Sequence, residues 1–513
     1  MRGDQPMGDA VAYHAGCKPR KLACIELATG RRWTYAEYHA HIERCAAWLQ
    51  TRLENPEGER VAVLGRNSAD LLALQLACVR IGAIFQPLNW RLTAAEIAFL
   101  VQDAQPRLVV FEAEFAGLLD QISPDVCDKV GFERFQIELA QAPARPFAAR
   151  PLAADTPATL LYTSGTTGRP KGVIVTESNA FHTAVNFSLA AEVTPDAVFL
   201  CEMPMFHVAG LYATARTTLF QGATLVIAPR FDACETLARL SDPDLGVTHY
   251  FCVPQMAQVL REQPGFDPKA LKRLKALCTG GAPNPPASIQ RWLDDGVAMI
   301  EGFGMTEAGT VLCMPLGDLD RIRSKLGATG LPALNAQVRL VDPEGQDVAD
   351  GEVGEIWLRG PNITPGYWGQ PELTAKAFTD GWLCTGDAAR RDAEGFIYLV
   401  DRWKDMFISG GENVFPAEVE AAILELDLVS EAAVVGTPDE RWGEVGVAYV
   451  AAVPGAAVTV DLILTHCRRR IAGYKTPKRV VVVDALPRTA SGKVRKDLLR
   501  QCGRPDIGEG GGP

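Results

Sequence analysis

Hydrophobic positions along the first 120 residues follow a helical period in some stretches and form short continuous runs in others. Residues 34–53 and 68–81 carry apolar side chains at helical spacing, which predicts two helices with one buried face each. The segment 93–96, Thr-Ala-Ala-Glu, is a capping box that predicts the start of a third helix. The apolar runs 60–65 and 107–111 have the length of buried strands. Strands that alternate with helices favour a parallel sheet covered on both faces.

The pattern changes further along the chain. An Ala- and Pro-rich segment, 141–156, predicts a connecting loop, and a second α/β stretch extends from about 157 to 323. We therefore expect an α/β fold in which a large N-terminal domain over 1–402 contains two α/β subdomains and a small β-barrel-like subdomain. A smaller α+β C-terminal domain follows over 405–513. The short strands that predict the barrel or antiparallel sheet are 337–341, 354–359 and 396–400.

Two local patterns lead to narrower expectations. His39 and His41 lie in the first predicted helix and point to different faces, so both are expected on the surface. The nearly uncharged run 445–460 has Pro454-Gly455 in its middle, which predicts a strand, a turn and a second strand.

Composition places the chain among globular proteins. Its 513 residues are 47% hydrophobic and 22% charged, which excludes a disulfide scaffold, a disordered protein and a fibrous repeat. The formal net charge of −11 argues against nonspecific nucleic-acid binding. The 13 cysteines include no CxxC pair, so buried free thiols are expected rather than a zinc site. We expect a cytoplasmic monomer or homodimer without an integral membrane segment, because no apolar run is long enough to span a bilayer.

The strongest chemical signal is the segment 160–172, Leu-Leu-Tyr-Thr-Ser-Gly-Thr-Thr-Gly-Arg-Pro-Lys-Gly. An apolar strand leads into a loop of hydroxyl residues and glycines, and Lys171 follows. Glycines let backbone N–H groups approach an anion, hydroxyl groups add donors, and the lysine adds a positive charge. The segment therefore predicts a polyphosphate site. It is not a Walker A loop, because no Gly-Lys pair precedes a Ser or Thr at the required spacing.

Together with later motifs, this loop resembles the adenylate-forming superfamily of acyl-CoA synthetases, aryl-CoA ligases, peptide-synthetase adenylation domains and luciferases. The likeness covers nearly the whole chain, and it is greatest to bacterial fatty-acid and feruloyl/cinnamate-type CoA ligases. The later motifs follow in the family's order: PMFHVAG at 204–210, TGGAP at 279–283, GFGMTE at 302–307, TGD at 385–387, DRWKD at 401–405, SGGEN at 409–413 and PRTASGK at 487–493.

The resemblance implies an enzyme that carries out two half-reactions. A carboxylate first attacks the α-phosphate of ATP to give acyl-AMP and pyrophosphate, and the thiolate of CoA then displaces AMP. ATP, Mg²⁺ and CoA are therefore the expected ligands, with Glu307 as the metal ligand and Thr306 as a donor to the α-phosphate. Lys171, His207 and Lys493 complete the implied catalytic set.

The resemblance also implies a nucleotide site. Asp387 would accept hydrogen bonds from the ribose hydroxyls with Arg402 alongside, and Phe303 would offer a stacking face to adenine where many relatives carry Tyr. The implied nucleotide-binding residues are Thr163, Ser164, Gly165, Thr166, Thr167, Gly168, Lys171, Gly281, Ala282, Phe303, Gly304, Thr306, Asp387, Arg402 and Lys493.

A mobile C-terminal domain is a further implication. In this interpretation the hinge is at 403–404, where Lys404 absorbs the backbone change, and the domain delivers Lys493 to the substrate carboxylate and α-phosphate before it rotates away. His207 would then gate the path from the acyl pocket to the thiol. Gly410, Gly411 and Trp442 would line the CoA tunnel.

The carboxylic acid itself is less well defined by the sequence. The implied acyl pocket is mostly apolar and uncharged, which favours a fatty acid of medium to long chain, with a feruloyl/cinnamate-type aryl acid as the alternative. An amino acid is disfavoured, because no acidic residue lies near His207 to bind an ammonium group. A non-catalytic nucleotide-binding relative and a hydrolytic ATPase are the alternatives from other classes. The expected pocket residues are Phe206, Val208, Leu211, Cys278, Thr279 and 308–311.

Overall fold

The computed structural model describes residues 8–120, 122, 127–141, 153–164, 170–282, 284–410, 412–439, 441–488 and 494–502. The chain divides into two compact units, each of which is described by itself. The first contains residues 1–338 and 358–383, and the second contains residues 339–357 and 384–513. No helix among the described residues is long and apolar enough to cross a membrane.

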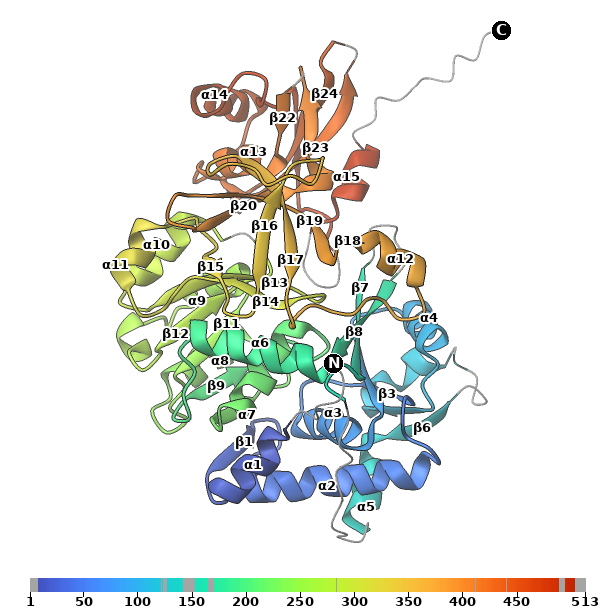
Figure 1. The fold of residues 1–513 in the computed structure, drawn as a ribbon. Coiled ribbons are helices and arrows are strands. Elements are labelled where there is room, and N and C mark those ends of the chain that lie inside the picture. The colour runs from blue at the N-terminus through green and yellow to red at the C-terminus, as the bar shows by residue number, and fades with distance from the viewer. Residues whose placement is uncertain are drawn as a thin grey trace. The chain divides into compact units, whose positions relative to one another are not determined.

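The first unit contains a six-stranded sheet in the order β6-β5-β3-β4-β7-β8 (Figure 1). Its strands pair in parallel, apart from the antiparallel pair formed by the last two. The predicted alternation of helices and strands is confirmed in this part of the chain. The strands are β3 Arg60–Leu64, β4 Ile84–Leu88, β5 Leu108–Phe111, β6 Asp128–Gly131, β7 Pro157–Ser164 and β8 Pro170–Thr176.

Helices of the N-terminal half begin where the sequence signals predict. Thr34 and Thr93 each accept a hydrogen bond from the N3 backbone of their helix and form capping boxes with Glu37 and Glu96. A capping box satisfies two backbone donors that the first turn leaves without partners. The helices of this half are α1 Ala10–Cys17, α2 Tyr35–Arg52, α3 Ala69–Ile81, α4 Ala94–Ala104 and α5 Phe132–Gln141.

A nine-stranded sheet forms the rest of the first unit's framework, in the order β15-β14-β13-β12-β11-β9-β10-β1-β2. Its six central strands are parallel, and the outer strands β2, β14 and β15 are antiparallel. The strands are β1 Leu22–Glu26, β2 Arg32–Thr34, β9 Val198–Cys201, β10 Thr224–Ile227, β11 His249–Cys252, β12 Ala276–Thr279, β13 Met299–Met305, β14 Gly309–Cys313 and β15 Leu331–Pro332.

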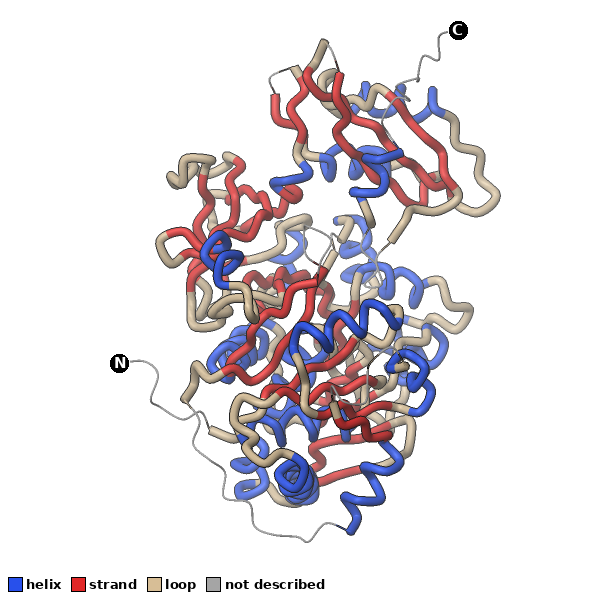
Figure 2. The backbone as a smooth tube through the Cα atoms, turned by 90° about the vertical axis from the view of Figure 1, so that its right-hand side faces the viewer, coloured by secondary structure: helices blue, strands red, loops and turns tan. Residues whose placement is uncertain are grey.

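Helices cover these sheets (Figure 2), and α2 packs beside α3. One hydrophobic core extends from α2 and α3 to strands of both sheets. Cys78 and Cys252 are fully buried, as their apolar surroundings predict. The remaining α- and π-helices described in the first unit are α6 Glu177–Ala190, the π-helix η2 Ala209–Arg216, α7 Thr217–Phe220, α8 Ala233–Ser241, α9 Pro254–Arg261, α10 Pro286–Asp294, α11 Leu319–Ser324 and α12 Pro371–Ala377.

The prediction for His41 is wrong, because this side chain is buried at 5% exposure. Its Nε2 atom lies 2.8 Å from Oδ1 of Asp70 on the neighbouring helix α3. Arg31 and Gln136 donate to the other oxygen of the same carboxylate. These bonds and His41 hold the pKa of Asp70 well below its usual range, although burial opposes the shift.

The second unit contains most of one sheet and all of another, because the division between the units passes through β16, β17 and β19 and leaves β18 in the first unit. The predicted short strands of 326–402 are present in the first sheet, ordered β16-β17-β19-β18 with β20 also on β19. In the second sheet, β22, β21, β24 and β23 follow one another, and β25 pairs with β24. The strands are β16 Gln337–Val341, β17 Val353–Arg359, β18 Phe378–Thr379, β19 Trp382–Arg391, β20 Ile397–Arg402, β21 Phe407–Ser409, β22 Glu412–Val414, β23 Val429–Asp439, β24 Gly443–Ala452 and β25 Arg479–Val483.

Helices α13 Pro416–Leu424, α14 Val460–Arg470 and α15 Lys496–Cys502 belong to the second unit. The expected second strand within 445–460 does not form. After β24 the chain turns at Gly455, and Thr459 caps α14 by accepting a hydrogen bond from Leu462 N. A capping threonine followed by a helix therefore replaces the strand that the apolar run predicts. The domain boundaries placed at 402–405 fall within this unit and stay a prediction.

Candidate active site

The predicted phosphate loop lies between the paired strands β7 and β8. Residues 165–169, which include Gly165, Thr166, Thr167 and Gly168, lie outside the described residues. The antiparallel register places Thr163 opposite Lys171 and Ser164 opposite Pro170. Among the described atoms, the buried Oγ1 of Thr163 has no hydrogen-bond partner. A hydroxyl and a lysine therefore meet at the base of the loop, as a phosphate site requires.

Lys171 contacts the predicted metal ligand directly. Its Nζ atom lies 3.0 Å from Oε1 of Glu307, and Nζ also donates to the hydroxyl of Tyr367 at 2.7 Å. The Tyr367 hydroxyl in turn donates to Glu307 Oε1 at 3.0 Å. Burial and the neighbouring carboxylate of Glu307 raise the pKa of Tyr367, so the phenol stays protonated and can donate. The structure thus brings together three side chains that are far apart in the sequence.

Sequence reasoning did not identify Tyr367. This residue reaches the site because the segment after β17 crosses β8 and the turn that holds Glu307. Thr364 N donates to the Glu307 carbonyl at 2.7 Å, and Trp368 N donates to the Gly172 carbonyl at 2.8 Å. The only sequence signal is the Gly-Tyr-Trp string at 366–368, which matches no phosphate or metal motif.

Thr306 and Glu307 occupy the turn between β13 and β14. Gly304 lies so close to the Gly309 carbonyl that a Cβ atom at position 304 would overlap it, and Met305 pairs with Gly309. The Glu307 side chain is buried, at 5% exposure. A carboxylate beside a predicted phosphate site fits Mg²⁺, which binds through one or two carboxylates and the substrate's phosphate oxygens. Such a site needs no larger cluster, and the described residues contain no group of three or more His, Cys, Asp or Glu that could hold a metal.

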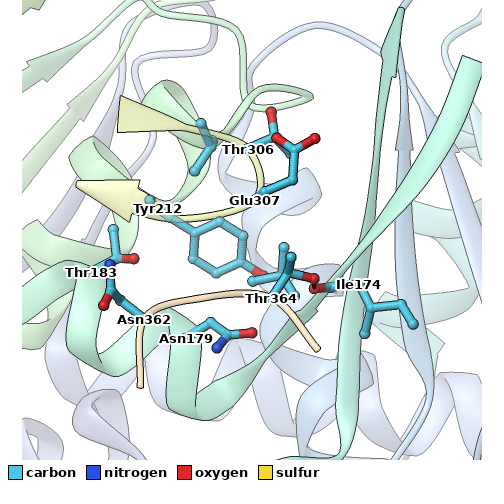
Figure 3. Close-up of a pocket in the computed structure, with 11 residues that line it drawn as sticks. Ile174, Asn179, Thr183, Tyr212, Thr306, Glu307, Asn362 and Thr364 are labelled. Carbon is cyan, nitrogen blue, oxygen red and sulfur yellow. Dashed lines mark hydrogen bonds between the residues drawn. The ribbon is translucent and has the colours of Figure 1, made fainter. Parts of the chain in front are cut away.

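A small cavity adjoins this turn (Figure 3). Its walls come from β8, α6, η2, the β13–β14 turn and the segment 360–366. In the described part of the chain, the buried Asn362 Oδ1 has no hydrogen-bond partner. The residues that line the cavity are Ile174, Val175, Asn179, Thr183, Val208, Tyr212, Thr306, Glu307, Gly309, Asn362 and Thr364.

His207 lies two residues before the first residue of the π-helix η2. Its backbone N–H donates to Pro204 O at 3.0 Å, and its ring centroid is 4.6 Å from that of Phe206. Leu211 N donates to the His207 carbonyl at 3.0 Å. The half-buried imidazole thus stands at the entry of an irregular helix, which is a frequent feature of functional sites.

The predicted adenine residues also come together. Gly281 and Ala282 follow β12, and Phe303 lies on β13, which is the parallel neighbour of β12. A Cβ atom on Gly280 would lie 2.9 Å from Gly302 O, so the two backbones are closely packed. Ligands in α/β sheets bind beyond the carboxyl ends of parallel strands, where this loop is located.

In the second unit, Asp387 lies directly opposite Arg402 in the pairing of β19 with β20. Asp387 is buried, and its backbone N–H donates to Thr385 Oγ1 at 3.0 Å. The side chains of Arg402 and Lys404 are outside the described part of the structure. The register nevertheless makes the two predicted ribose residues neighbours.

The predicted hinge coincides with a short 3-10 helix, η4 Trp403–Asp405. Beyond it, Gly410 has a φ of 63° and its N–H donates to the Trp442 carbonyl at 2.8 Å. A Cβ atom on Gly410 would lie 2.7 Å from the Trp442 ring, so these two predicted CoA-tunnel residues are in contact. Gly411 and Lys493 lie outside the described residues.

Comparisons with known proteins agree with these motifs. Residues 11–368 match the AMP-binding enzyme family, and residues 418–493 match the AMP-binding enzyme C-terminal domain. Feruloyl-CoA synthase of Amycolatopsis sp is 39% identical over 92% of this chain and 94% of its own length. Long-chain-fatty-acid–CoA ligase of Mycobacterium tuberculosis is 35% identical over 96% of this chain and 98% of its own.

A solved structure shares the fold. O-succinylbenzoate coenzyme A synthetase from Bacillus subtilis, in complex with ATP and magnesium ion, superposes with a TM-score of 0.85. It is 30% identical and covers 97% of this chain and 99% of its own.

Proposed function

We propose, from the premise that the chain belongs to the AMP-binding enzyme family, that it joins a hydrophobic carboxylic acid to CoA. The enzyme uses ATP and Mg²⁺, and CoA is its co-substrate. The observation that supports this reaction most directly is the contact of Lys171 with Glu307 and Tyr367 beside Thr163. This contact supports a site in which a cation for phosphate lies beside a carboxylate for a divalent metal.

Each residue has a task in the first half-reaction. Lys171 and the hydroxyl groups of its loop hold the β- and γ-phosphates, which leave as pyrophosphate. Glu307 binds Mg²⁺, whose charge offsets that of the phosphate oxygens, and Thr306 donates to the α-phosphate. Lys493 offsets the charge on the attacking carboxylate. These contributions are mainly positioning and electrostatic stabilisation.

The residues of the remaining motifs bind the nucleotide and guide the thiol of CoA. Asp387 and Arg402 bind the ribose, and Phe303 with Gly281 and Ala282 receives adenine. After rotation at 403–404, the Gly410 and Trp442 region guides CoA toward the acyl-AMP, with His207 between the acyl pocket and the thiol path.

For the acid, an arylalkenoic compound of the cinnamate type is our first candidate. The feruloyl-CoA synthase relative shares 39% identity with this chain, against 35% for the long-chain-fatty-acid ligase. A fatty acid is the second candidate. The buried, apolar side chains of Leu211, Cys278 and Val311 in the expected acyl pocket support this second candidate.

The test is acid-dependent exchange of labelled pyrophosphate into ATP, followed by a screen of CoA consumption with fatty, benzoic and cinnamic acids. We expect exchange only when an acid is present, and a kcat/KM for a cinnamic acid at least about tenfold above that for fatty acids. A non-catalytic relative would show no exchange with any acid, and a hydrolytic ATPase would release orthophosphate. Higher kcat/KM for fatty acids would reverse the order of the two candidate acids.

A further inference from the structure

Helix α15 carries two cations on one face and directly follows the segment that contains Lys493. Lys496 and Arg500 are four residues apart, so their side chains lie one above the other on the helix. Lys496 Nζ is 2.8 Å from Glu420 Oε1 on α13, and Arg500 donates to Asp405 Oδ1 at 2.6 Å. Asp405 is the last residue of η4, the turn that holds the predicted hinge.

The Lys496 pair is largely removed from water. The two side chains are 16% and 17% exposed, and Glu420 Oε1 also accepts a bond from Val434 N at 2.7 Å. Burial lowers the pKa of Lys496, but Glu420 and Asp401 outweigh it and raise that pKa above its ordinary value, so the ammonium group stays charged. Removal of one partner from such a pair leaves an uncompensated charge, which is costly.

Acidic partners come from both sides of the predicted hinge. Asp401 lies on β20, before the hinge, and accepts a hydrogen bond from Ala417 N in the first turn of α13 at 2.7 Å. Glu420 and Asp405 lie at or after the hinge. The cations of α15 therefore pair with Glu420 and Asp405, and the nearby charge of Asp401 also acts on Lys496.

Other contacts fix the chain next to Lys493. Arg488 and Val494 form an antiparallel bridge across 489–493, and Arg495 N donates to Pro487 O at 2.7 Å. The buried Tyr449 hydroxyl donates to Leu499 O at 2.9 Å. The two ends of the segment are thus joined to each other, and α15 is joined to β24.

We propose that Lys496 and Arg500 are positioning residues for adenylation, because they tie helix α15, which follows Lys493 in the chain, to the hinge turn and α13 through Asp405 and Glu420. This inference rests on the role proposed above for Lys493. Rotation at 403–404 then moves Asp405, α13 and α15 together, so the ion pairs of α15 affect where Lys493 arrives. Without the Arg500–Asp405 pair the helix can shift relative to the turn, and small displacements of a reacting group slow catalysis strongly.

The test measures the two half-reactions separately in the full-length enzyme. Arg500→Ala and Asp405→Asn are expected to slow single-turnover formation of acyl-AMP about tenfold. Both should leave thioester formation from supplied acyl-AMP within about twofold of wild type, because Lys493 acts only in the first step. Arg500→Lys, which keeps the charge, should recover part of the rate. Arg495→Ala is the matched control, because it removes an exposed ion pair with Asp497 at the start of the same helix.

Equal losses in both half-reactions, together with a lower melting temperature, would overturn the inference in favour of a purely structural role. Unchanged adenylation in both Arg500→Ala and Asp405→Asn would overturn it as well. Lys493→Ala in the same assay separates the inference from the proposed function. If Lys493→Ala slows adenylation and Arg500→Ala does not, only the positioning role fails. If Lys493→Ala has no effect on adenylation, the proposed role of Lys493 fails and the inference fails with it.

Discussion

The ammonium group of Lys171 and the carboxylate of Glu307 form an ion pair, with 3.0 Å between Nζ and Oε1. In the proposed function, Lys171 binds the phosphates of ATP and Glu307 binds Mg²⁺. Binding of the nucleotide with its metal must therefore exchange this pair for two new ones. Tyr367 contacts both groups and can hold them near each other during the exchange.

The first prediction concerns that hydroxyl. Tyr367→Phe removes the acceptor for Lys171 and the donor to Glu307 but keeps the ring, over which Lys171 Nζ lies 4.1 Å from the centroid. We expect acid-dependent pyrophosphate exchange to fall about tenfold, since one charge-assisted hydrogen bond contributes ~1.5–3 kcal/mol. Tyr162→Phe is the control, because its hydroxyl donates to Asp103, outside this group. Exchange rates that are equal in the two variants would show that Tyr367 has no special role.

The second prediction concerns the pH dependence of stability. Burial raises the pKa of Glu301 from 4.5 to about 8, although a hydrogen bond from the backbone of Asn284 opposes the shift. Between these values the folded state holds a proton that the unfolded state has lost. The contribution to stability is therefore complete below pH 4.5 and falls by about 1.4 kcal/mol for each pH unit up to pH 8.

Glu301→Gln keeps the shape of the side chain and removes this titration. Urea unfolding at pH 5 and pH 8 should show that the variant gains stability relative to wild type as the pH rises. A difference in the free energy of unfolding that stays constant from pH 5 to pH 8 would contradict the prediction that the buried Glu301 carboxyl is protonated in the folded state.

The third prediction concerns Gly309, which has a φ of 59°. A Cβ atom there would overlap Oγ1 of Thr183 on α6 at the wall of the cavity in Figure 3. We expect Gly309→Ala to lower the free energy of unfolding by about 1–3 kcal/mol, the range for overpacked sites. Adding Thr183→Ala to the Gly309→Ala variant should restore part of the lost free energy of unfolding. Gly369→Ala is matched in backbone, with a φ of 64° and no atom near its Cβ, and should cost less. An equal cost at the two glycines would mean that backbone strain alone explains the effect.

The fourth prediction concerns the hinge. Lys404→Pro fixes φ at position 404 and restricts Trp403, so rotation at 403–404 should be impeded. We expect thioester formation from supplied acyl-AMP to slow by about tenfold or more, with adenylation affected much less. Lys404→Ala, which leaves the backbone free, should retain both steps. An unchanged thioester step in the proline variant would remove the argument for rotation at this position.

Local signals predicted much of the fold. The capping threonines bond within the first turn of their own helices, so a short sequence pattern identifies them. The strands of the N-terminal half pair with distant segments, but their short apolar runs mark where they lie. The strand before the phosphate loop was predicted from its apolar run, whereas Thr306 and Glu307 were singled out by the family resemblance of the segment 302–307. Tyr367 was not, because its place depends on backbone bonds from 364 to 307 and from 368 to 172. His41 was misplaced because its partner Asp70 lies on another helix. Both of these errors concern tertiary contacts that no local spacing records, whereas the strand wrongly expected within 445–460 is prevented by a local signal, the capping Thr459.

The pairing of Asp387 with Arg402 has a mechanical consequence. Strand β20 ends at Arg402, and the turn η4 begins at the next residue. The pivot proposed at Lys404 is thus only two residues beyond a strand whose last residue, Arg402, pairs with Asp387 on β19. A rotating domain reaches a defined position only if its pivot is fixed. Here the pivot is held next to Asp387 and Arg402, the residues expected to bind the ribose. Nucleotide occupancy and the alignment of the swinging domain would then be set at the same point of the chain.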